Sequence, residues 1–367
     1  MRFTIKRETM VVTLQKICIS ISKNSLLNIL KYILVKINSN DVILITTNLD
    51  IEIKAKLKAN KIYTKGMFLI HARKFLNICR KFNLHSLIDI ICYKNIIKIT
   101  SKNATFTLQT LSVDKFPIIN NFEKKISFKI SQSKIKYMFQ MIYFSMGKND
   151  VRHYLNGIYL KIKNDKIITV ATDGYRLSKC VSTIKNNFLK HSVIISRDSI
   201  LELIKILDNN DIEIKIFINN NNIRFVLNDF IFTSKIINSK FPDYKNIIIK
   251  KPNNIIKLEC DIIKNALLRA SIIAKEKFCA VNINIKKNNI IIKANNKEQD
   301  EIKELIKTKN EIKNINFHIN INYILDILNI IKSKYINLLL EKQISCIQLE
   351  KKNNGYLLIY IIMPLKI

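Results

Sequence analysis

The chain repeats itself three times, and this constrains its fold more than any other feature. An apolar helix stripe at i, i+3, i+4 and i+7 begins at Phe75 and recurs from Ile200 and Ile324, at offsets of 125 and 124 residues. A second helix stripe recurs in the same order: Met10, Leu14 and Ile17; Ile135, Phe139 and Ile142; Ile263, Leu267 and Ala270. Three copies in one order and at one spacing predict three similar tandem domains.

Strand patterns accompany the helices in each repeat. A short alternating strand precedes the second stripe at Phe3–Ile5, Phe128–Ile130 and Leu258–Cys260. Runs of β-branched residues then enter polar turns: Ile43–Thr47, Ile167–Thr172 and Asn289–Asn295. Each repeat is therefore predicted to be an α+β domain of two helices and about eight strands. Pro117 and Pro242 each lie just past the last strands of a repeat, where proline stops strand pairing. The predicted domains are 1–125, 126–252 and 253–367.

The net charge points to a polyanionic partner. The 367 residues include 62 Lys and Arg against 28 Asp and Glu, which gives a formal charge of +34. Such a charge favours nucleic acid or an anionic membrane as a partner. Ile, Lys and Asn dominate every segment, however, so a compositional bias is the competing explanation. Basic residues on the polar faces of all six predicted helices favour the DNA backbone, and the sequence shows no base-reading motif.

The sequence contains no recognisable catalytic, nucleotide or metal site. It lacks G-x-G-x-x-G, G-x-x-x-x-G-K-[ST] and G-x-S-x-G, and its histidines lack metal-ligand spacing. Its seven scattered cysteines predict free thiols in a reducing cytosol. We expect no cofactor, no metal, no catalysis and no membrane segment. The acidic run Glu298–Glu304 suits a contact to a basic partner better than a cation site, and Asp150 and Asp173 suit turns better than catalysis.

Nine segments carry a family resemblance that runs from end to end: His71–Phe75, Phe144–Met146, Asp150–Arg152, Tyr154–Gly157, Ala171–Leu177, Asn221–Arg224, Asp229–Lys235, Phe241–Tyr244 and Met363–Leu365. With them the chain resembles the bacterial sliding clamps, the β subunits of the replicative DNA polymerase III. The resemblance implies a head-to-tail homodimer, closed into a ring of six domains with helices inside and strands outside.

The resemblance also implies the function. A clamp is a processivity factor in chromosomal DNA replication and a non-catalytic subunit of the DNA polymerase III holoenzyme. It encircles double-stranded DNA without reading its sequence and keeps the polymerase at high effective concentration. The implied partners are the DNA polymerase III catalytic subunit, an ATP-using clamp loader, and other polymerases and repair proteins with clamp-binding peptides. A cytoplasmic, nucleoid-associated protein is expected.

The family's functional positions fall on three groups of residues. DNA contacts fall on Arg73 and Tyr154, which match the family, and on Asn24, Asn149 and His153, where an arginine, a glutamine and a tyrosine are usual. The partner-peptide cleft falls on Leu155, Thr172, Gly174, Arg176, Leu177, Pro242, Met363, Pro364 and Leu365. The dimer interface falls on Lys74, Ile78, Phe82, Phe106 and Leu108 of one copy, opposite Ile272, Ile273, Glu298, Glu301 and Glu304 of the other.

Two other hypotheses remain open from the residues alone. The first is an ordinary basic nucleic-acid-binding protein that acts through its charge. The second is an enzyme with an unrecognised site. The threefold repeat and the terminal Met363–Leu365 segment favour the clamp over the first, and the absence of a convergent polar constellation disfavours the second.

Overall fold

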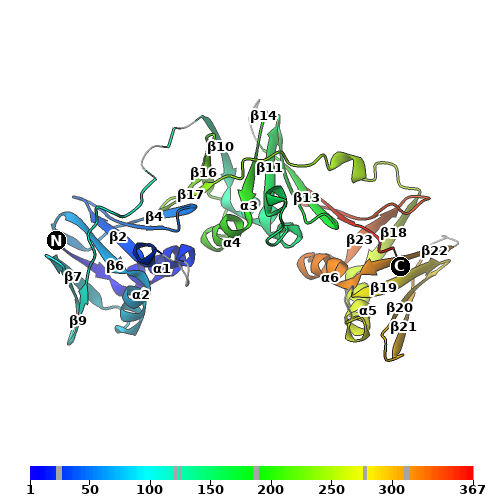
Figure 1. The fold of residues 1–367 in the computed structure, drawn as a ribbon, viewed down its shortest axis with the longest axis horizontal. Helices are drawn as coiled ribbons and strands as arrows, with labels where there is room; N and C mark the ends of the chain where they lie inside the picture. Colours follow the sequence, from blue (N-terminus) through cyan, green and yellow to red (C-terminus); the bar gives the residue numbers. More distant parts are fainter. Residues whose placement is uncertain are drawn as a thin grey trace. The chain divides into compact units, whose positions relative to one another are not determined.

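The computed structural model describes residues 1–21, 27–119, 122–123, 125–184, 190–275, 279–309 and 314–366. These residues form two compact units, which are described separately (Figure 1). Unit 1 consists of Met1–Lys136 and Leu201–Ile236, and unit 2 of Tyr137–Ile200 and Ile237–Ile367. The second predicted repeat thus contributes to both units, because its strands belong to two different sheets.

Unit 1 contains a five-stranded and an eight-stranded antiparallel sheet. In spatial order, the five-stranded sheet consists of β5 (Lys61–Thr64), β1 (Arg2–Lys6), β7 (Leu87–Tyr93), β8 (Ile96–Ser101) and β9 (Ala104–Gln109). The eight-stranded sheet consists of β10 (Ile126–Ser131), β15 (Glu213–Ile218), β16 (Asn222–Val226), β17 (Phe230–Lys235), β4 (Ile51–Leu57), β3 (Val42–Thr47), β2 (Tyr32–Ile37) and β6 (Gly66–His71).

Unit 2 has the same organisation with an eight-stranded and a four-stranded sheet. The eight-stranded sheet consists of β14 (Lys190–Ser196), β11 (Gly157–Lys163), β12 (Lys166–Thr172), β13 (Arg176–Thr183), β25 (Tyr356–Ile362), β24 (Ile347–Asn353), β23 (Tyr335–Leu340) and β18 (Asn254–Glu259). The four-stranded sheet consists of β21 (Glu301–Lys307), β20 (Asn289–Asn295), β19 (Ala280–Lys286) and β22 (Asn314–Asn320).

Two helices accompany each predicted repeat: α1 (Arg7–Ile17) and α2 (Ala72–Lys81), α3 (Gln132–Gln140) and α4 (Arg197–Ile206), α5 (Cys260–Ile273) and α6 (Ile321–Ile330). Within unit 1 α1 packs on α2, and within unit 2 α5 packs on α6. The apolar stripes found in the sequence face the core, since Phe75, Leu203 and Leu328 are all buried. Burial of these stripes, rather than helix propensity, stabilises helices of this length.

Two details of the predicted elements are wrong. Cys260 was expected to end a strand, but β18 ends at Glu259 and Cys260 is the first residue of α5. Ile142 was expected on the second helix, but α3 ends at Gln140 and Ile142 lies in the turn that follows. Ile142 is nevertheless fully buried. An apolar side chain can fill the core from a turn as well as from a helix, so burial alone does not fix a helix end.

Each eight-stranded sheet joins strands of two successive repeats. In unit 1, β4 of the first repeat pairs with β17 of the second, with Ala55 opposite Phe230. In unit 2, β13 of the second repeat pairs with β25 of the third, with Cys180 opposite Leu358. The backbone hydrogen bonds of the sheet therefore continue across each repeat boundary within the chain.

The segments that link the repeats cover these sheets. Phe116 of the first linking segment is buried against Leu34, Ile45 and Leu69. Phe241 of the second is buried in a cluster with Leu177 and other strand residues.

Buried side chains also hold the two linking segments in place. The Ile119 amide donates to Oε2 of the fully buried Glu52 at 2.8 Å, and the Ile249 amide donates to Oε1 of the fully buried Gln348 at 2.9 Å. A buried polar side chain of this kind requires its hydrogen bond. Each linking segment is thus attached to the sheet beneath it by a buried hydrogen bond as well as by the packing of its phenylalanine.

Candidate functional site

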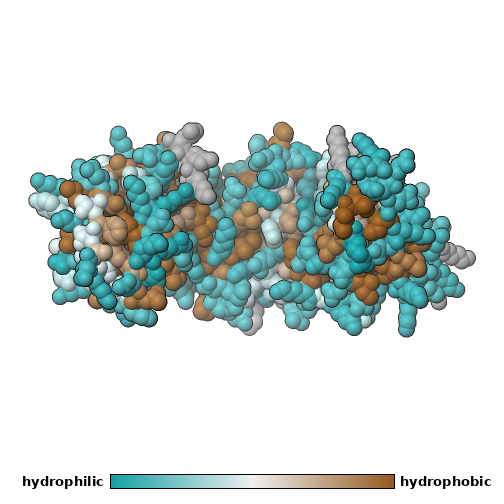
Figure 2. Space-filling model, turned by 90° about the horizontal axis from the view of Figure 1, so that it is seen from below, coloured by the Kyte–Doolittle hydropathy of each residue, from teal (hydrophilic) through white to brown (hydrophobic). Residues whose placement is uncertain are grey.

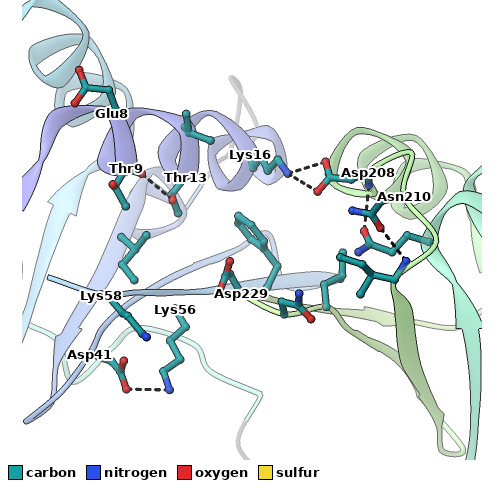
Figure 3. Close-up of a pocket in the computed structure, with 17 residues that line it drawn as sticks. Glu8, Thr9, Thr13, Lys16, Asp41, Lys56, Lys58, Asp208, Asn210 and Asp229 are labelled. Carbon is teal, nitrogen blue, oxygen red and sulfur yellow. Dashed lines mark hydrogen bonds and ion pairs between the residues drawn. The ribbon is translucent and has the colours of Figure 1, made fainter. Parts of the chain in front are cut away.

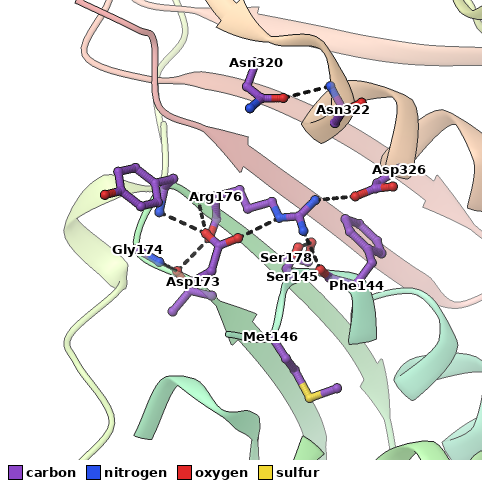
Figure 4. A network of polar contacts seen from close by, with 12 residues as sticks. Phe144, Ser145, Met146, Asp173, Gly174, Arg176, Ser178, Asn320, Asn322 and Asp326 are labelled. Carbon is purple, nitrogen blue, oxygen red and sulfur yellow. Dashed lines mark hydrogen bonds and ion pairs between the residues drawn. The ribbon is translucent and has the colours of Figure 1, made fainter. Parts of the chain in front are cut away.

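Arg176 at the start of β13 is the centre of a polar network in unit 2 (Figure 4). Its Nε donates to Asp173 Oδ2 at 2.9 Å, its Nη1 to Asp326 Oδ2 at 2.6 Å, and its Nη2 to the Phe144 carbonyl at 2.6 Å. The guanidinium also lies over the rings of Phe144 and Tyr323, at 5.3 and 4.6 Å. With 12% of its side chain exposed, Arg176 connects three segments of this unit.

A tight turn leads into this arginine. The Asp173 Oδ1 accepts hydrogen bonds from the amides of Tyr175 and Arg176, both at 3.0 Å, and Thr172 Oγ1 accepts one from Gly174 at 3.1 Å. Gly174 has φ +93°, a backbone conformation that residues with a Cβ rarely adopt. A Cβ there would also lie 3.1 Å from Arg152 Nη2. Glycine adopts this conformation without strain, and any side chain here would need Arg152 to shift.

The C-terminal segment lies against the same turn. The Met363 amide donates to the Tyr175 carbonyl at 2.9 Å, and the Leu365 amide donates to the His318 carbonyl of β22 at 2.8 Å. These bonds fix the segment that carries Pro364 between the turn and β22. The fold thus brings residues 172–177 together with residues 363–365, as the resemblance implied.

The predicted cleft residues differ in their exposure. Leu155, Thr172 and Leu177 are buried, whereas Gly174, Pro242 and Met363 are exposed. Two exposed side chains that were not among the predicted cleft residues belong to the same region: Tyr175 is 64% exposed and Val151 is 90% exposed. The buried residues therefore support a surface on which apolar groups are available to a ligand.

The predicted DNA-contact residues lie in both units. Arg73 is exposed on α2 in unit 1, and Tyr154 is half-buried in unit 2. Asn149 and His153 are exposed and line a hollow of about 460 Å³, together with Asn156, Ser196 and Arg197. Asn24 lies outside the described residues. The hollow combines donors of the kind that contact phosphate oxygens, such as Arg and Asn side chains, with the carboxylate of Asp198, which also lines it. Figure 2 shows mostly hydrophilic side chains on the face seen from below, with separate hydrophobic areas between them.

Arg152 also has a defined partner beside this hollow. Its Nη2 lies 2.9 Å from Asp150 Oδ2, and its Nε lies 3.0 Å from Asp150 Oδ1. These hydrogen bonds lower the pKa of Asp150 to about 2. Asp150 is thus a turn residue with a fixed ionised partner, which agrees with its non-catalytic interpretation.

A larger hollow of about 780 Å³ lies in unit 1, beside α1 and the β16–β17 turn (Figure 3). Lys16 Nζ lies 3.0 Å from Asp208 Oδ1 and 5.3 Å from the centre of the Phe230 ring, and Lys56 Nζ lies 2.9 Å from Asp41 Oδ2. These two lysines already have anionic partners within the wall of the hollow. We therefore assign no ligand to it.

The predicted dimer residues lie on two separate surfaces. In unit 1 Phe106 of β9 is 38% exposed, and its ring packs edge-on against the buried Phe82 at 5.8 Å. Lys74 is exposed, Leu108 is half-buried and Ile78 is buried. In unit 2 Ile272 of α5 is 62% exposed and Ile273 is half-buried, and Glu298 and Glu301 are exposed.

Glu304 has a partner within its own chain that the sequence did not predict. Arg269 Nε donates to Glu304 Oε1 at 2.6 Å, and Arg269 Nη2 donates to Oε2 at 2.9 Å. This bidentate contact lowers the pKa of Glu304. Of the predicted acidic run, Glu298 and Glu301 are exposed, whereas Glu304 is paired within its own chain.

Three further findings concern metal sites, cysteines and membrane segments. Among the described residues, no group of three or more His, Cys, Asp and Glu side chains could hold a metal ion. All seven cysteines are free thiols, and burial raises the pKa of Cys18 to about 12. In the described ranges, no helix is long and apolar enough to cross a membrane.

Comparison with known proteins decides the family. Three family models match successive parts of the chain: the DNA polymerase III beta subunit N-terminal domain at residues 1–120, the central domain at 129–243 and the C-terminal domain at 245–366. The chain belongs to the DNA polymerase III β-subunit family. The motif-based resemblance and the fold of three tandem clamp domains are thereby confirmed.

Individual relatives of the β-subunit family agree over the full length. The chain is 39% identical to the beta sliding clamp of Buchnera aphidicola subsp. Rhopalosiphum padi and 32% identical to that of Escherichia coli K12, with 100% of each chain covered. The crystal structure of the Pseudomonas aeruginosa DNA polymerase III subunit beta matches with a TM-score of 0.96 at 28% identity, again with both chains fully covered. The β subunit is a non-catalytic subunit, so the chain is not an enzyme.

The family positions do not account for every residue of the network in unit 2. Asp326, Tyr323 and the Phe144 carbonyl all contact Arg176 but were not predicted. Asp326 lies 150 positions from Arg176, and no local pattern marks it as a partner. Only the packing of α6 beside β13 reveals the contact.

Proposed function

We propose that the chain is a processivity clamp for DNA replication. Two copies join head to tail into a closed ring around duplex DNA, slide along it, and keep the replicative polymerase at its primer end. The three proposed domains of each copy, 1–125, 126–252 and 253–367, give the ring six similar parts. Tethering raises the effective concentration of polymerase at the end it extends, so that the polymerase rebinds there after each release.

One structural observation carries the proposed ring. Strand β17 of the second repeat pairs with β4 of the first, and β25 of the third pairs with β13 of the second. In the order of strands along each repeat, β9 corresponds to β17 and β25, and β21 corresponds to β4 and β13. Both β9 and β21 are edge strands, of the five-stranded and the four-stranded sheet. An edge strand presents unpaired backbone groups to a partner strand. Pairing of β9 with β21 of a second copy therefore repeats the junction used twice within the chain.

Side chains around these two edges suit the same interface. Phe106 and Leu108 lie on β9, and Leu305 on β21 is 57% exposed. Ile272 lies on α5, which packs against β21. Burial of such apolar side chains between two copies provides the main favourable term of association. We therefore assign the dimer interface to the residues that the sequence predicted.

We assign DNA contacts to Arg73, Tyr154, Asn149 and His153, with Arg152 and Arg197 nearby in unit 2. Donors of this kind bind phosphate oxygens and carry no sequence information, so binding is sequence-independent. A ring on chromosomal DNA places the protein in the cytoplasm, on the nucleoid.

The partner-peptide site is assigned to the turn 172–177 and the C-terminal segment 363–365. Sliding clamps from Pseudomonas aeruginosa and Bartonella birtlesii, with TM-scores of 0.96 and 0.94 to this chain, were solved bound to griselimycin. We propose that this chain also binds griselimycin, and that the same site takes apolar peptides of the polymerase catalytic subunit, the clamp loader and repair proteins.

The experiment that tests the ring uses topology. The clamp is loaded onto nicked circular DNA with a clamp loader and ATP, and the complex is washed at high salt. A closed ring stays on circles and is lost when the DNA is linearised, because it can slide off the ends. A protein held by its +34 charge alone is lost equally from circles and linear DNA, since salt weakens phosphate contacts in both. Equal loss would replace the clamp by simple electrostatic binding.

A further inference from the structure

The turn before Arg176 has a close counterpart in the first repeat. In the second repeat, the side chains of Thr172 and Asp173 accept hydrogen bonds from amides of the turn. In the first repeat, the Leu49 amide donates to Thr47 Oγ1 at 3.1 Å, and the Ile51 amide donates to Asn48 Oδ1 at 2.7 Å. Leu49 takes the place of Gly174 and also has a positive φ, of 77°. The two turns therefore have the same backbone construction.

The residue that follows the turn differs in chemical character between the first and the second repeat. Ile51 takes the place of Arg176 and is 1% exposed, and β4 still pairs with β17 of the second repeat. The repeat thus serves as an internal control. The fold needs the turn but does not need the arginine, because the first junction forms the same sheet without it.

Each nitrogen of the Arg176 guanidinium donates a hydrogen bond to a protein acceptor. Nε, Nη1 and Nη2 each donate to an acceptor, at 2.9 Å or less, and two aromatic rings flank the guanidinium plane. Three of the five guanidinium N–H groups are used in this way, so the guanidinium is held in one orientation. Its position is defined by Asp326 on α6, by the turn, and by the segment before Met146.

We propose that Asp326 is a positioning residue of the partner site, acting through Arg176. This inference rests on the proposed function and assigns a role to a residue outside the family's cleft positions. Asp326 holds Arg176 against the Phe144 carbonyl and Asp173. Arg176 is thereby held beside the turn that carries Gly174 and Tyr175, and the Tyr175 carbonyl accepts a hydrogen bond from Met363. Asp326 therefore acts on ligand binding through the position of Arg176, which is itself one of the predicted cleft residues.

The test measures griselimycin binding by calorimetry in four full-length proteins. Asp326→Asn removes the charge from a charge-assisted hydrogen bond, so we expect affinity to fall about tenfold. Asp326→Glu keeps the carboxylate and should recover most of the affinity. Asn329→Ala changes an exposed residue of the same helix and should bind like the unchanged chain. The dimer constant and retention on circular DNA should stay the same in all four.

Three outcomes decide the matter. If Asp326→Asn binds as tightly as the unchanged chain, or more tightly, Asp326 does not position Arg176 for binding and the proposal is wrong. If Asp326→Glu fails to restore binding, the carboxylate is not what matters, and the proposal is again wrong. If the unchanged chain does not bind griselimycin, the proposed partner site itself fails, which is a separate result.

A second variant keeps the proposal testable if Asp326→Asn does not fold. Arg176→Lys retains the positive charge but has one nitrogen in place of the three that reach Asp173, Asp326 and Phe144. We expect it to lose affinity to a similar extent. Unchanged affinity in Arg176→Lys would overturn the positioning role.

Discussion

Ala55 of the first repeat lies opposite Phe230 of the second in one antiparallel ladder. The two residues are far apart in the sequence and belong to different repeats, yet their strands are neighbours in a single eight-stranded sheet. The same arrangement joins the second and third repeats in unit 2. Because β9 and β21 are left as sheet edges, this relationship leads directly to the first prediction.

Shortening two apolar side chains at these edges should weaken the dimer. Burial of a side chain such as Phe106 or Ile272 is worth about 1.5–3 kcal/mol, so the double change to Ala should weaken dimerisation tens-fold or more. Sedimentation equilibrium measures the constant. Ile255→Ala is the matched control, because Ile255 and Ile272 are both 62% exposed and Ile255 lies on β18. An unchanged constant in the double variant, or an equal loss in the control, would place the interface elsewhere.

Removal of the C-terminal segment should abolish ligand binding but leave the dimer intact. Deletion of residues 363–367 removes the groups that bond to the Tyr175 and His318 carbonyls, together with the exposed Met363. Griselimycin titration by fluorescence or calorimetry measures the effect. The control deletes residues 366–367 alone and leaves both hydrogen bonds in place. Equal affinity of the long deletion and the full chain would show that the partner site is misplaced.

A DNA contact at Arg73 predicts a change in salt dependence. Loss of one phosphate contact should lower the slope of log K against log salt by about 0.9 for B-form DNA. Arg73→Ala is therefore expected to bind linear duplex more weakly at low salt and with a shallower slope. Lys81→Ala removes an exposed cation from the same helix and is the control. Identical slopes for the two variants would mean that net charge, not a defined contact, determines binding.

The Asp150–Arg152 pair predicts a specific titration. Asp150 should titrate with a midpoint near pH 2, because hydrogen bonds from Arg152 stabilise its ionised form. A depressed pKa contributes stability that is fully present above the unfolded value of 3.8 and is lost as the pH falls toward about 2. Carboxyl NMR shifts measure the midpoint. In Arg152→Ala it should rise toward 3.8 but stay below it, because the amide of residue 152 still donates to Asp150 Oδ1, and an unchanged midpoint would exclude the Arg152 side chain as the main cause.

The first linking segment should contribute to the stability of unit 1. Phe116 is 6% exposed and packs on Leu34, Ile45 and Leu69, so Phe116→Ala should lower the free energy of unfolding by about 3 kcal/mol. Urea denaturation measures the loss. Tyr93→Ala, at a side chain that is 71% exposed, should change stability by less than about 0.5 kcal/mol. Similar losses in both variants would mean that the segment does not stabilise the sheet.

The sequence by itself determined the repeat, the α+β class and the family. Apolar periodicity is a local property, and the buried stripes through Phe75 and Leu328 show it directly. The segments that carry the resemblance, such as Ala171–Leu177 and Met363–Leu365, likewise identified the residues of the proposed partner site. The turn could be recognised in the sequence because it is held by local hydrogen bonds, which Thr172 and Asp173 accept from amides of neighbouring residues.

Only the tertiary structure decided which distant residues meet. Sheet pairing between Ala55 and Phe230, and the contact of Arg176 with Asp326, depend on how whole elements pack and leave no periodic signal in the chain. The partner of Glu304 was likewise decided by the tertiary structure. The sequence predicted a contact between its acidic run and another copy, but Arg269 on α5 binds Glu304 within the same chain. A side chain's partner is set by the geometry of packed elements, and that geometry is a property of the complete fold.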